Sequence, residues 1–193
     1  MKEKIILIGG GGHCRSCIDV IEMEGKYEIS GIIDTREKSG EKILGYKIIG
    51  TDDDLESLAS AHQNFIITIG HLENPARRIE IFNNLKSIGV HLPVIVSPLA
   101  HVSKHAKVEE GTIIMHYAMV NSGAMIGKNC IINTKALVEH DTQIGNHCHI
   151  STSATVNGNC NVGDRCFIGS NSTVVHQRNV PSNTFIRAHS LFK

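Results

Sequence analysis

An aliphatic residue recurs at every sixth position through the second half of the chain. The series starts at Val102 and ends at Ile186, and all fifteen positions hold Ile or Val. A unit this short is too short for a helical repeat and too regular for a sandwich strand, and it fits one flat side of a three-sided prism. Three sides close a coil of about 18 residues, and stacked coils hydrogen-bond at the roughly 4.8 Å spacing of β-strands. The pattern therefore predicts a stack of five coils.

Each repeat has a second inward position, two residues before the aliphatic one, where the side chain is nearly always small. Cys130, Cys148 and Cys166 occupy this position, 18 residues apart, in a column that also holds Thr112. Because neighbouring repeats place Ala and Thr there, we interpret the three cysteines as small core residues and predict no metal site.

The first half of the chain has a different pattern. Short aliphatic runs at Ile5–Ile8, Ile29–Ile33 and Phe65–Ile69 are separated by stretches typical of helices. Continuous apolar strands of this kind indicate a parallel sheet that is buried on both faces. We predict two domains, a Rossmann-like domain at 1–97 and a repeat domain at 98–193.

Charge and hydropathy exclude several classes of partner. The chain has 19 Lys+Arg and 19 Asp+Glu, so no basic excess is available to neutralise nucleic-acid phosphates. No apolar run approaches the roughly 18 residues that a membrane helix requires. The N-terminus lacks the features of a signal peptide. We therefore expect a cytoplasmic protein with reduced cysteines that binds neither nucleic acid nor membrane.

Both halves together resemble one family. The glycine-rich turn Gly9–His13 after a first strand, Asp34 after a second, and the segment Val138–Asp141 within the hexapeptide repeats are similar to the bacterial sugar acetyltransferases of sialic acid and bacillosamine biosynthesis. The resemblance implies a left-handed parallel β-helix after the Rossmann-like domain. It also implies acetyl-CoA as co-substrate, a nucleotide sugar as acceptor and a homotrimer with active sites between subunits.

The N-terminal domain carries a candidate anion site. The glycine cluster ends a strand and precedes a helix, where backbone N–H groups and the helix N-terminus favour negative charge. The resemblance implies that the anion is a sugar-nucleotide diphosphate, with His13 toward the sugar and Asp34 toward the base or ribose. The predicted substrate-binding residues are Gly10, Gly11, Gly12, His13, Asp34, Gly70 and His71.

His140 is the candidate catalytic base. It follows inward Val138 by two residues, where the chain turns a corner and a side chain can point outward. Acyl transfer needs a base, an oxyanion donor and a carboxylate that fixes the imidazole. Asp141 or Glu139 supplies the carboxylate. The resemblance assigns the base role to His140 and places His149 near the thioester.

The predicted cofactor-binding residues complete this site. Gly158 lies one coil beyond His140, where its backbone N–H suits an oxyanion donor, and His176 lies one coil further. The C-terminal segment lacks the Gly-x-Pro-Ala-Lys-like turn common in the family. In its absence, coils of two subunits would hold the coenzyme.

The expected reaction is N-acetylation of a UDP-linked 4-amino sugar for surface glycan or glycoprotein biosynthesis. Two alternatives remain open. One is O-acetylation of a sialic-acid-like nonulosonate, and the other is a non-catalytic protein that binds sugar nucleotides. A zinc carbonic anhydrase would use histidines such as His116 and His147 across a trimer interface, but those enzymes resemble the repeat domain alone, whereas this chain also has a nucleotide-sugar-like N-terminal domain.

Overall fold

The computed structural model describes residues 2–193, which form two compact units. The N-terminal unit comprises the chain up to Gly70 together with Ala76–Pro93. The β-helix unit comprises His71–Pro75 together with Val94–Lys193. No helix within residues 2–193 has the length and apolar character needed to cross a membrane.

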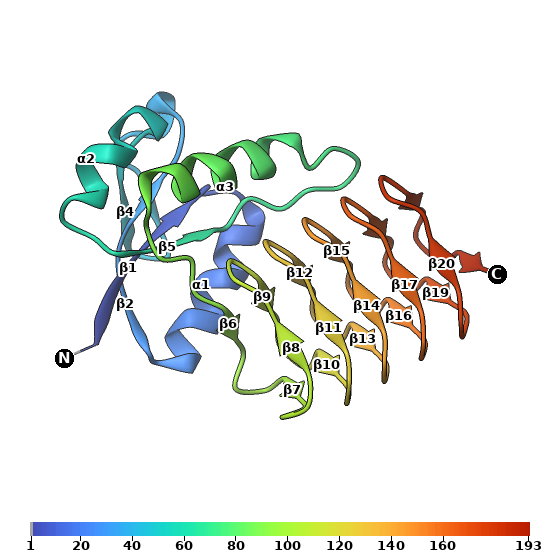
Figure 1. The fold of residues 1–193 in the computed structure, drawn as a ribbon. Coiled ribbons are helices and arrows are strands. Elements are labelled where there is room, and N and C mark those ends of the chain that lie inside the picture. The colour runs from blue at the N-terminus through green and yellow to red at the C-terminus, as the bar shows by residue number, and fades with distance from the viewer. Residues whose placement is uncertain (1) are drawn as a thin grey trace. The chain divides into compact units, whose positions relative to one another are not determined.

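The N-terminal unit is built on a five-stranded sheet with the order β3-β4-β2-β1-β5 (Figure 1). All neighbouring strands are parallel except β3, which pairs antiparallel with β4. Strand β1, which has parallel neighbours on both sides, contributes Ile5–Ile8, which are at most 1% exposed, as expected for a parallel strand covered on both faces. The elements are β1 (Glu3–Ile8), α1 (Gly12–Glu24), β2 (Tyr27–Ile33), η1 (Arg36–Lys38), β3 (Lys42–Ile43), β4 (Tyr46–Gly50), η2 (Asp52–Asp54), α2 (Leu55–Ala59), β5 (Asn64–Ile67) and α3 (Ala76–Ile88).

Helix α1 follows the glycine-rich turn directly. It begins at Gly12 and ends at a left-handed Gly25 whose N–H donates to the Ile21 carbonyl. Its first turn therefore lies at the carboxyl edge of the sheet, where the strands of a doubly wound fold present their ligand-binding loops.

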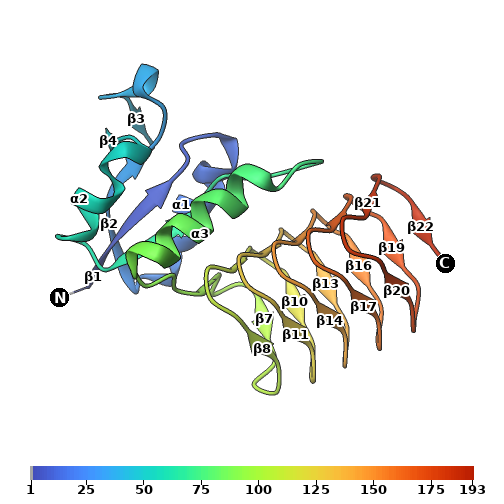
Figure 2. The same ribbon diagram turned by 45° about the horizontal axis from the view of Figure 1, so that its top comes forward.

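The β-helix unit consists of two-residue strands in three parallel sheets, and its coils stack along one axis (Figure 2). Strands pair with a register of 18 residues, as in Leu137 with Thr155 and Val138 with Val156. The predicted inward Ile, Val and small residues form one continuous buried cluster. The first sheet has β7 (His101–Val102), β10 (Met119–Val120), β13 (Leu137–Val138), β16 (Thr155–Val156), β19 (Thr173–Val174) and β22 (Leu191–Phe192); the second has β8 (Lys107–Val108), β11 (Met125–Ile126), β14 (Gln143–Ile144), β17 (Asn161–Val162) and β20 (Asn179–Val180); the third has β6 (Ile95–Val96), β9 (Ile113–Ile114), β12 (Ile131–Ile132), β15 (His149–Ile150), β18 (Phe167–Ile168) and β21 (Phe185–Ile186).

Strand β6 begins the β-helix before the domain boundary that we predicted after residue 97. It pairs in parallel with β9, so it belongs to the third sheet. The division between the units falls at Pro93, and Pro93 and Pro98 flank this strand on its two sides.

The buried thiols contribute to the core of the β-helix unit. Cys130 and Cys148 direct their Sγ atoms to the carbonyls of Gly145 and Gly163, each at 3.1 Å. Thr112 makes the same contact to the Gly127 carbonyl at 2.8 Å. The column therefore satisfies one corner carbonyl per coil, which explains why its residues carry a thiol or a hydroxyl.

Candidate active site

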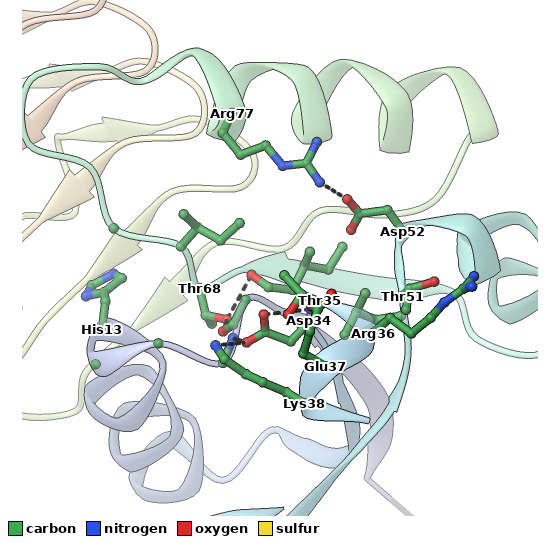
Figure 3. A pocket seen from close by; sticks show the side chains of 18 of the residues that line it. His13, Asp34, Thr35, Arg36, Glu37, Lys38, Thr51, Asp52, Thr68 and Arg77 are labelled. Carbon is green, nitrogen blue, oxygen red and sulfur yellow. Dashed lines mark hydrogen bonds and ion pairs between the residues drawn. The ribbon is translucent and has the colours of Figure 1, made fainter. Parts of the chain in front are cut away.

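A cavity of about 860 Å³ opens at the carboxyl ends of β1, β2, β4 and β5 in the N-terminal unit (Figure 3). Residues that follow these strands line it, including the glycine-rich turn, Asp34, Thr51 and Gly70. Parallel sheets of this type bind ligands at the same edge.

The glycine-rich turn is open to the cavity. A Cβ on Gly10 would lie 2.6 Å from Asp34 Oδ2 and 2.4 Å from the Ile43 side chain, so this position requires glycine. A Cβ on Gly11 or Gly12 would meet nothing within 4 Å. The first turn of α1 holds no acidic residue, so its N–H groups can face an anion without a competing carboxylate.

Asp34 organises the floor of the cavity. Its Oδ2 accepts hydrogen bonds from the Gly10 N–H at 2.8 Å and the Lys38 ammonium at 3.0 Å, and Oδ1 accepts from the Thr35 N–H at 2.7 Å. Burial raises the pKa of Asp34, but these three donors outweigh it and hold the pKa below its ordinary value. The ionised carboxylate therefore fixes the glycine turn and keeps lone pairs for a ligand.

Sequence reasoning missed the charged rim of the cavity. Arg77 at the start of α3 forms an ion pair with Asp52, and Lys38 pairs with Asp34 (Figure 3). Both cations line the cavity, together with Arg36. The position of Asp52 directly after β4 was a usable sequence signal, since all parallel strands place the residues that follow them at one edge of the sheet. No sequence signal indicated the ion pair between Arg77 and Asp52, because only the tertiary fold brings the start of α3 to the cavity.

The predicted substrate residues do not all lie in this cavity. His13 lines it, and a Cβ on Gly70 would lie 3.3 Å from the His13 Cβ, so these two residues are adjacent. His71 is not among the lining residues. It belongs instead to the β-helix unit, where it is 7% exposed. The prediction that His71 lines the cavity is therefore wrong, because its ring packs against His149 and Phe167 of the third sheet.

His140 lies at the turn between β13 and β14 and is half exposed. Its Nδ1 is 2.9 Å from Asp141 Oδ2. A carboxylate only accepts hydrogen bonds, so Nδ1 carries the proton and Nε2 keeps a free lone pair. Glu139 contacts the backbone N–H of His140 rather than its ring, at 3.1 Å, and also accepts from Asn121. Asp141, and not Glu139, therefore orients the imidazole.

The local backbone fixes this pair. Asp141 has φ +57, a left-handed conformation that recurs every sixth residue at the corners of the coils. Its N–H donates to the Ser122 carbonyl at 3.1 Å. A Cβ on Gly123 would collide with Asp141 Oδ1, so glycine at 123 leaves room for the carboxylate.

Gly158 lies against the His140 ring. A Cβ on Gly158 would be 2.6 Å from His140 Nε2, which places the basic nitrogen over this residue. On the preceding coils, a side chain caps the equivalent N–H: Asn121 Oδ1 caps Ser122 at 2.9 Å. At Gly158 the preceding Asn157 donates to the Val174 carbonyl instead. Within residues 2–193 the Gly158 N–H has no acceptor, so it is available to an oxyanion.

His176 and His149 differ in their relation to this site. His176 is exposed on the same corner, with its ring centroid 6.3 Å from that of His140. His149 is on β15 in the third sheet, away from the corner that carries His140, and is only 5% exposed. The protomer therefore brings together His140, Asp141, Gly158 and His176, but not His149.

His116 and His147 are engaged within the β-helix unit. Ser97 Oγ is 2.6 Å from His116 Nδ1, and Asn129 Nδ2 is 3.0 Å from His147 Nδ1. Each contact ties one coil or turn to the next.

A parallel β-helix of hexapeptides, with a carboxylate-oriented histidine beside an uncapped N–H, defines a hexapeptide-repeat acyltransferase. Comparisons with known proteins agree. The model of the PglD N-terminal domain matches residues 4–85, and that of the bacterial transferase hexapeptide (six repeats) matches residues 105–140 and 141–176. No curated protein matches the chain.

Solved structures extend the likeness over the whole chain. The acetyltransferase domain of PglB from Neisseria gonorrhoeae is 30% identical with a TM-score of 0.92, over 100% of this chain and 92% of that one. Its complex with acetyl coenzyme A has a TM-score of 0.89 at 30% identity, over 97% and 89% of the two chains. A perosamine N-acetyltransferase from Caulobacter crescentus, solved as a histidine-to-asparagine variant with CoA and GDP-perosamine, is 26% identical with a TM-score of 0.92, over 98% and 88%.

The chain therefore belongs to the bacterial sugar acetyltransferases that join a PglD-type N-terminal domain to a left-handed β-helix of hexapeptide repeats. It is an acyltransferase, as the sequence resemblance implied.

Proposed function

We propose that this acetyltransferase transfers the acetyl group of acetyl-CoA to the amino group of a nucleotide-linked sugar, with a UDP-linked 4-amino sugar as the expected acceptor. The observation that carries the proposal is the His140 imidazole, whose Nδ1 is held by Asp141 and whose Nε2 lies beside the uncapped Gly158 N–H.

This geometry supplies the groups that aminolysis of a thioester requires. The acceptor nitrogen forms a bond to the thioester carbonyl carbon, and His140 Nε2 takes the proton that this nitrogen loses. The Gly158 N–H donates to the carbonyl oxygen as negative charge develops on it. When the carbon–sulfur bond breaks, the imidazolium returns the proton to the departing thiolate. The products are an amide and free CoA.

The cavity of the N-terminal unit suits the acceptor's diphosphate. It combines the open N-terminus of α1 with Lys38, Arg36 and Arg77, each of which pairs with a carboxylate that also lines the cavity. Nucleotide-linked amino sugars are also supported by the similar perosamine N-acetyltransferase, which was solved with GDP-perosamine. We therefore favour N-acetylation over O-acetylation of a nonulosonate.

The β-helix unit offers a surface suited to the pantetheine arm of the acetyl donor. A second cavity of about 480 Å³ is lined by Leu72, Phe167, Phe185 and Ala188, together with Ser151, Ser170 and Glu73. Apolar walls with a few hydroxyls suit an alkyl chain that carries amide groups.

We also propose a homotrimer. Three of the six outward side chains of the first sheet are apolar, namely Met119, Leu137 and Leu191, and Met119 and Leu191 are 41% and 55% exposed. The corner that carries His140 borders this sheet, so a copy packed on it would enclose the catalytic turn. The cytoplasmic location expected from the sequence stays a prediction.

The test is a panel of acceptors with acetyl-CoA, monitored by free-thiol release and by mass spectrometry of the sugar. The panel contains UDP-linked and GDP-linked 4-amino sugars, CMP-linked nonulosonates and free nonulosonates. We expect amide formation on a nucleotide-linked amine. Ester formation on a nonulosonate would establish the O-acetyltransferase alternative. Binding of UDP or GDP without turnover of any acceptor would establish the non-catalytic alternative.

A further inference from the structure

One arginine of helix α3 is fully buried inside the N-terminal unit. Arg78 is 1% exposed, and its Nη1 donates to the Ile67 carbonyl at 2.7 Å and to the Ile69 carbonyl at 2.8 Å. Burial of a charged group is costly unless hydrogen bonds compensate for it, and hydrogen bonds from a charged donor are stronger than neutral ones. Arg78 therefore fixes the position of the backbone segment that carries these two carbonyls.

The two carbonyls lie at the carboxyl end of β5, the last strand of the five-stranded sheet. Alternate residues of a strand direct their backbone N–H and C=O groups to opposite sides. Thr68 faces β1, since its N–H donates to the Ile8 carbonyl at 2.8 Å. The carbonyls of Ile67 and Ile69 therefore face the outer edge of the sheet, where Arg78 Nη1 supplies the donors that a neighbouring strand supplies elsewhere.

The segment that Arg78 holds packs against the start of the glycine-rich turn. The Thr68 hydroxyl lies 2.7 Å from the Gly9 carbonyl oxygen and 3.0 Å from that of Ile8, and Thr68 is fully buried. Gly9 has φ +102, and a Cβ there would lie 2.2 Å from the Ile69 side chain. Thr68 and Ile69 thus fix the backbone of Gly9, and all three residues line the cavity of the N-terminal unit.

We infer that Arg78 is a positioning residue for the diphosphate of the nucleotide sugar. Arg78 holds the end of β5, the end of β5 holds Gly9, and Gly9 leads into Gly10–Gly12, where the first turn of α1 suits an anion. Arg78 itself is not among the residues that line the cavity, so it acts through these contacts and not on the ligand. All the residues involved belong to the N-terminal unit. The inference rests on the proposed function, which assigns the diphosphate to this cavity.

The test compares two substitutions of Arg78 that differ in their hydrogen-bond donors. Arg78→Met removes the donors and keeps an unbranched side chain in the core. Arg78→Lys keeps the charge and three N–H donors on one nitrogen, which suits two bonds that both leave Nη1. Leu85→Ala is the matched control, because Leu85 is fully buried on the same helix, about two turns beyond Arg78, and its truncation destabilises the protein through lost packing.

Three measurements are made on each variant. Titration calorimetry gives the Kd of UDP and of GDP. Hydrogen–deuterium exchange gives the protection of the Thr68 N–H and of the peptide that holds Gly9–Gly12. Thermal melts give the stability, so that all binding is measured well below the lowest melting temperature.

We expect Arg78→Met to raise the Kd of UDP or GDP about 10-fold and to speed both exchange rates about 10-fold. Arg78→Lys should reverse most of each effect. Leu85→Ala should lower the melting temperature and leave the Kd within about twofold. If Arg78→Met does not fold, Thr68→Val stands in for it, since it removes the hydroxyl that joins the end of β5 to Gly9, and it should raise the same Kd severalfold.

The inference is overturned if Arg78→Met, or Thr68→Val in its place, binds the nucleotide as tightly as the unsubstituted protein. It is also overturned if Leu85→Ala weakens binding as much as Arg78→Met, because Arg78 would then contribute stability alone. If the unsubstituted protein binds neither UDP nor GDP, the proposed function of the cavity is wrong, and the nucleotide role of Arg78 falls with it. The exchange rate of the Thr68 N–H still decides whether Arg78 holds the end of β5.

Discussion

A methyl group on Gly158 should disable the catalytic base without removing any functional group. The Cβ of Gly158→Ala would lie 2.6 Å from His140 Nε2 and 2.8 Å from Cε1. Ordinary contact is about 3.5 Å, so the ring must move by roughly 1 Å. The ring is half exposed and free to move outward, but doing so pulls it away from Asp141. A displacement of this size costs on the order of 10²-fold in rate.

The fold should tolerate this substitution. Gly158 is not among the glycines with positive φ, and the equivalent residues on the other coils, Ser122, His140 and His176, carry side chains. We therefore expect the free energy of unfolding to change by no more than about 0.5 kcal/mol. Thermal melts check this point alongside the kinetics.

The kinetic assay is thiol release from acetyl-CoA with a verified acceptor, measured for the two single variants and the double variant. Gly158→Ala should lower kcat about 10²-fold, and His140→Ala 10²- to 10⁴-fold. Because both act through the same imidazole, the double variant should be no slower than His140→Ala alone. The reasoning is refuted if Gly158→Ala keeps kcat within threefold, or if the two losses multiply.

Four further outcomes are expected. Asp141→Asn should lower kcat on the order of 10²-fold, less than the roughly 10⁴-fold known for a buried triad carboxylate, because His140 is half exposed; steady-state kinetics with unchanged melts would show it. Val138→Ala should lower the free energy of unfolding by about 2 kcal/mol in urea titrations, since Val138 is fully buried. Asp34→Asn should destabilise the protein near pH 7. The pKa of Asp34 in the folded protein lies below its ordinary 3.8, so the ionised carboxylate stabilises the fold above pH 3.8, and this stabilisation is lost as pH falls through the folded pKa. The difference in unfolding free energy between the unsubstituted protein and Asp34→Asn should therefore be smaller at pH 3 than at pH 7. Met119→Glu should yield a folded monomer by light scattering at micromolar concentration, and a trimer that survives it would place the interface elsewhere.

The repeat domain was predictable because its inward residues recur at a fixed, short spacing in the sequence. An inward aliphatic residue every six positions leaves one regular arrangement that buries all of them, and Val138 is 0% exposed as expected. The position of His140 followed directly, since a residue two places beyond an inward position must turn out at a corner. Gly158 followed from adding 18 residues to His140.

The links made by tertiary structure were not predictable in this way. His71 follows a strand of the sheet, so its sequence position indicated the cavity, yet packing against Phe167 and His149 places it in the other unit. His149 Nε2 lies 3.0 Å from Asn133 Nδ2, and its Nδ1 lies 2.7 Å from the His71 carbonyl oxygen. No spacing in the sequence predicts these two contacts.

The most direct test of the account is the rate of amide formation on a nucleotide-linked amino sugar by the unsubstituted protein and by His140→Ala, at matched saturation with acetyl-CoA. The account predicts N-acetylated product from the unsubstituted protein and a kcat at least 10²-fold lower for His140→Ala, with CoA affinity and melting temperature retained. A His140→Ala enzyme that forms the same amide at a near-normal kcat would contradict it.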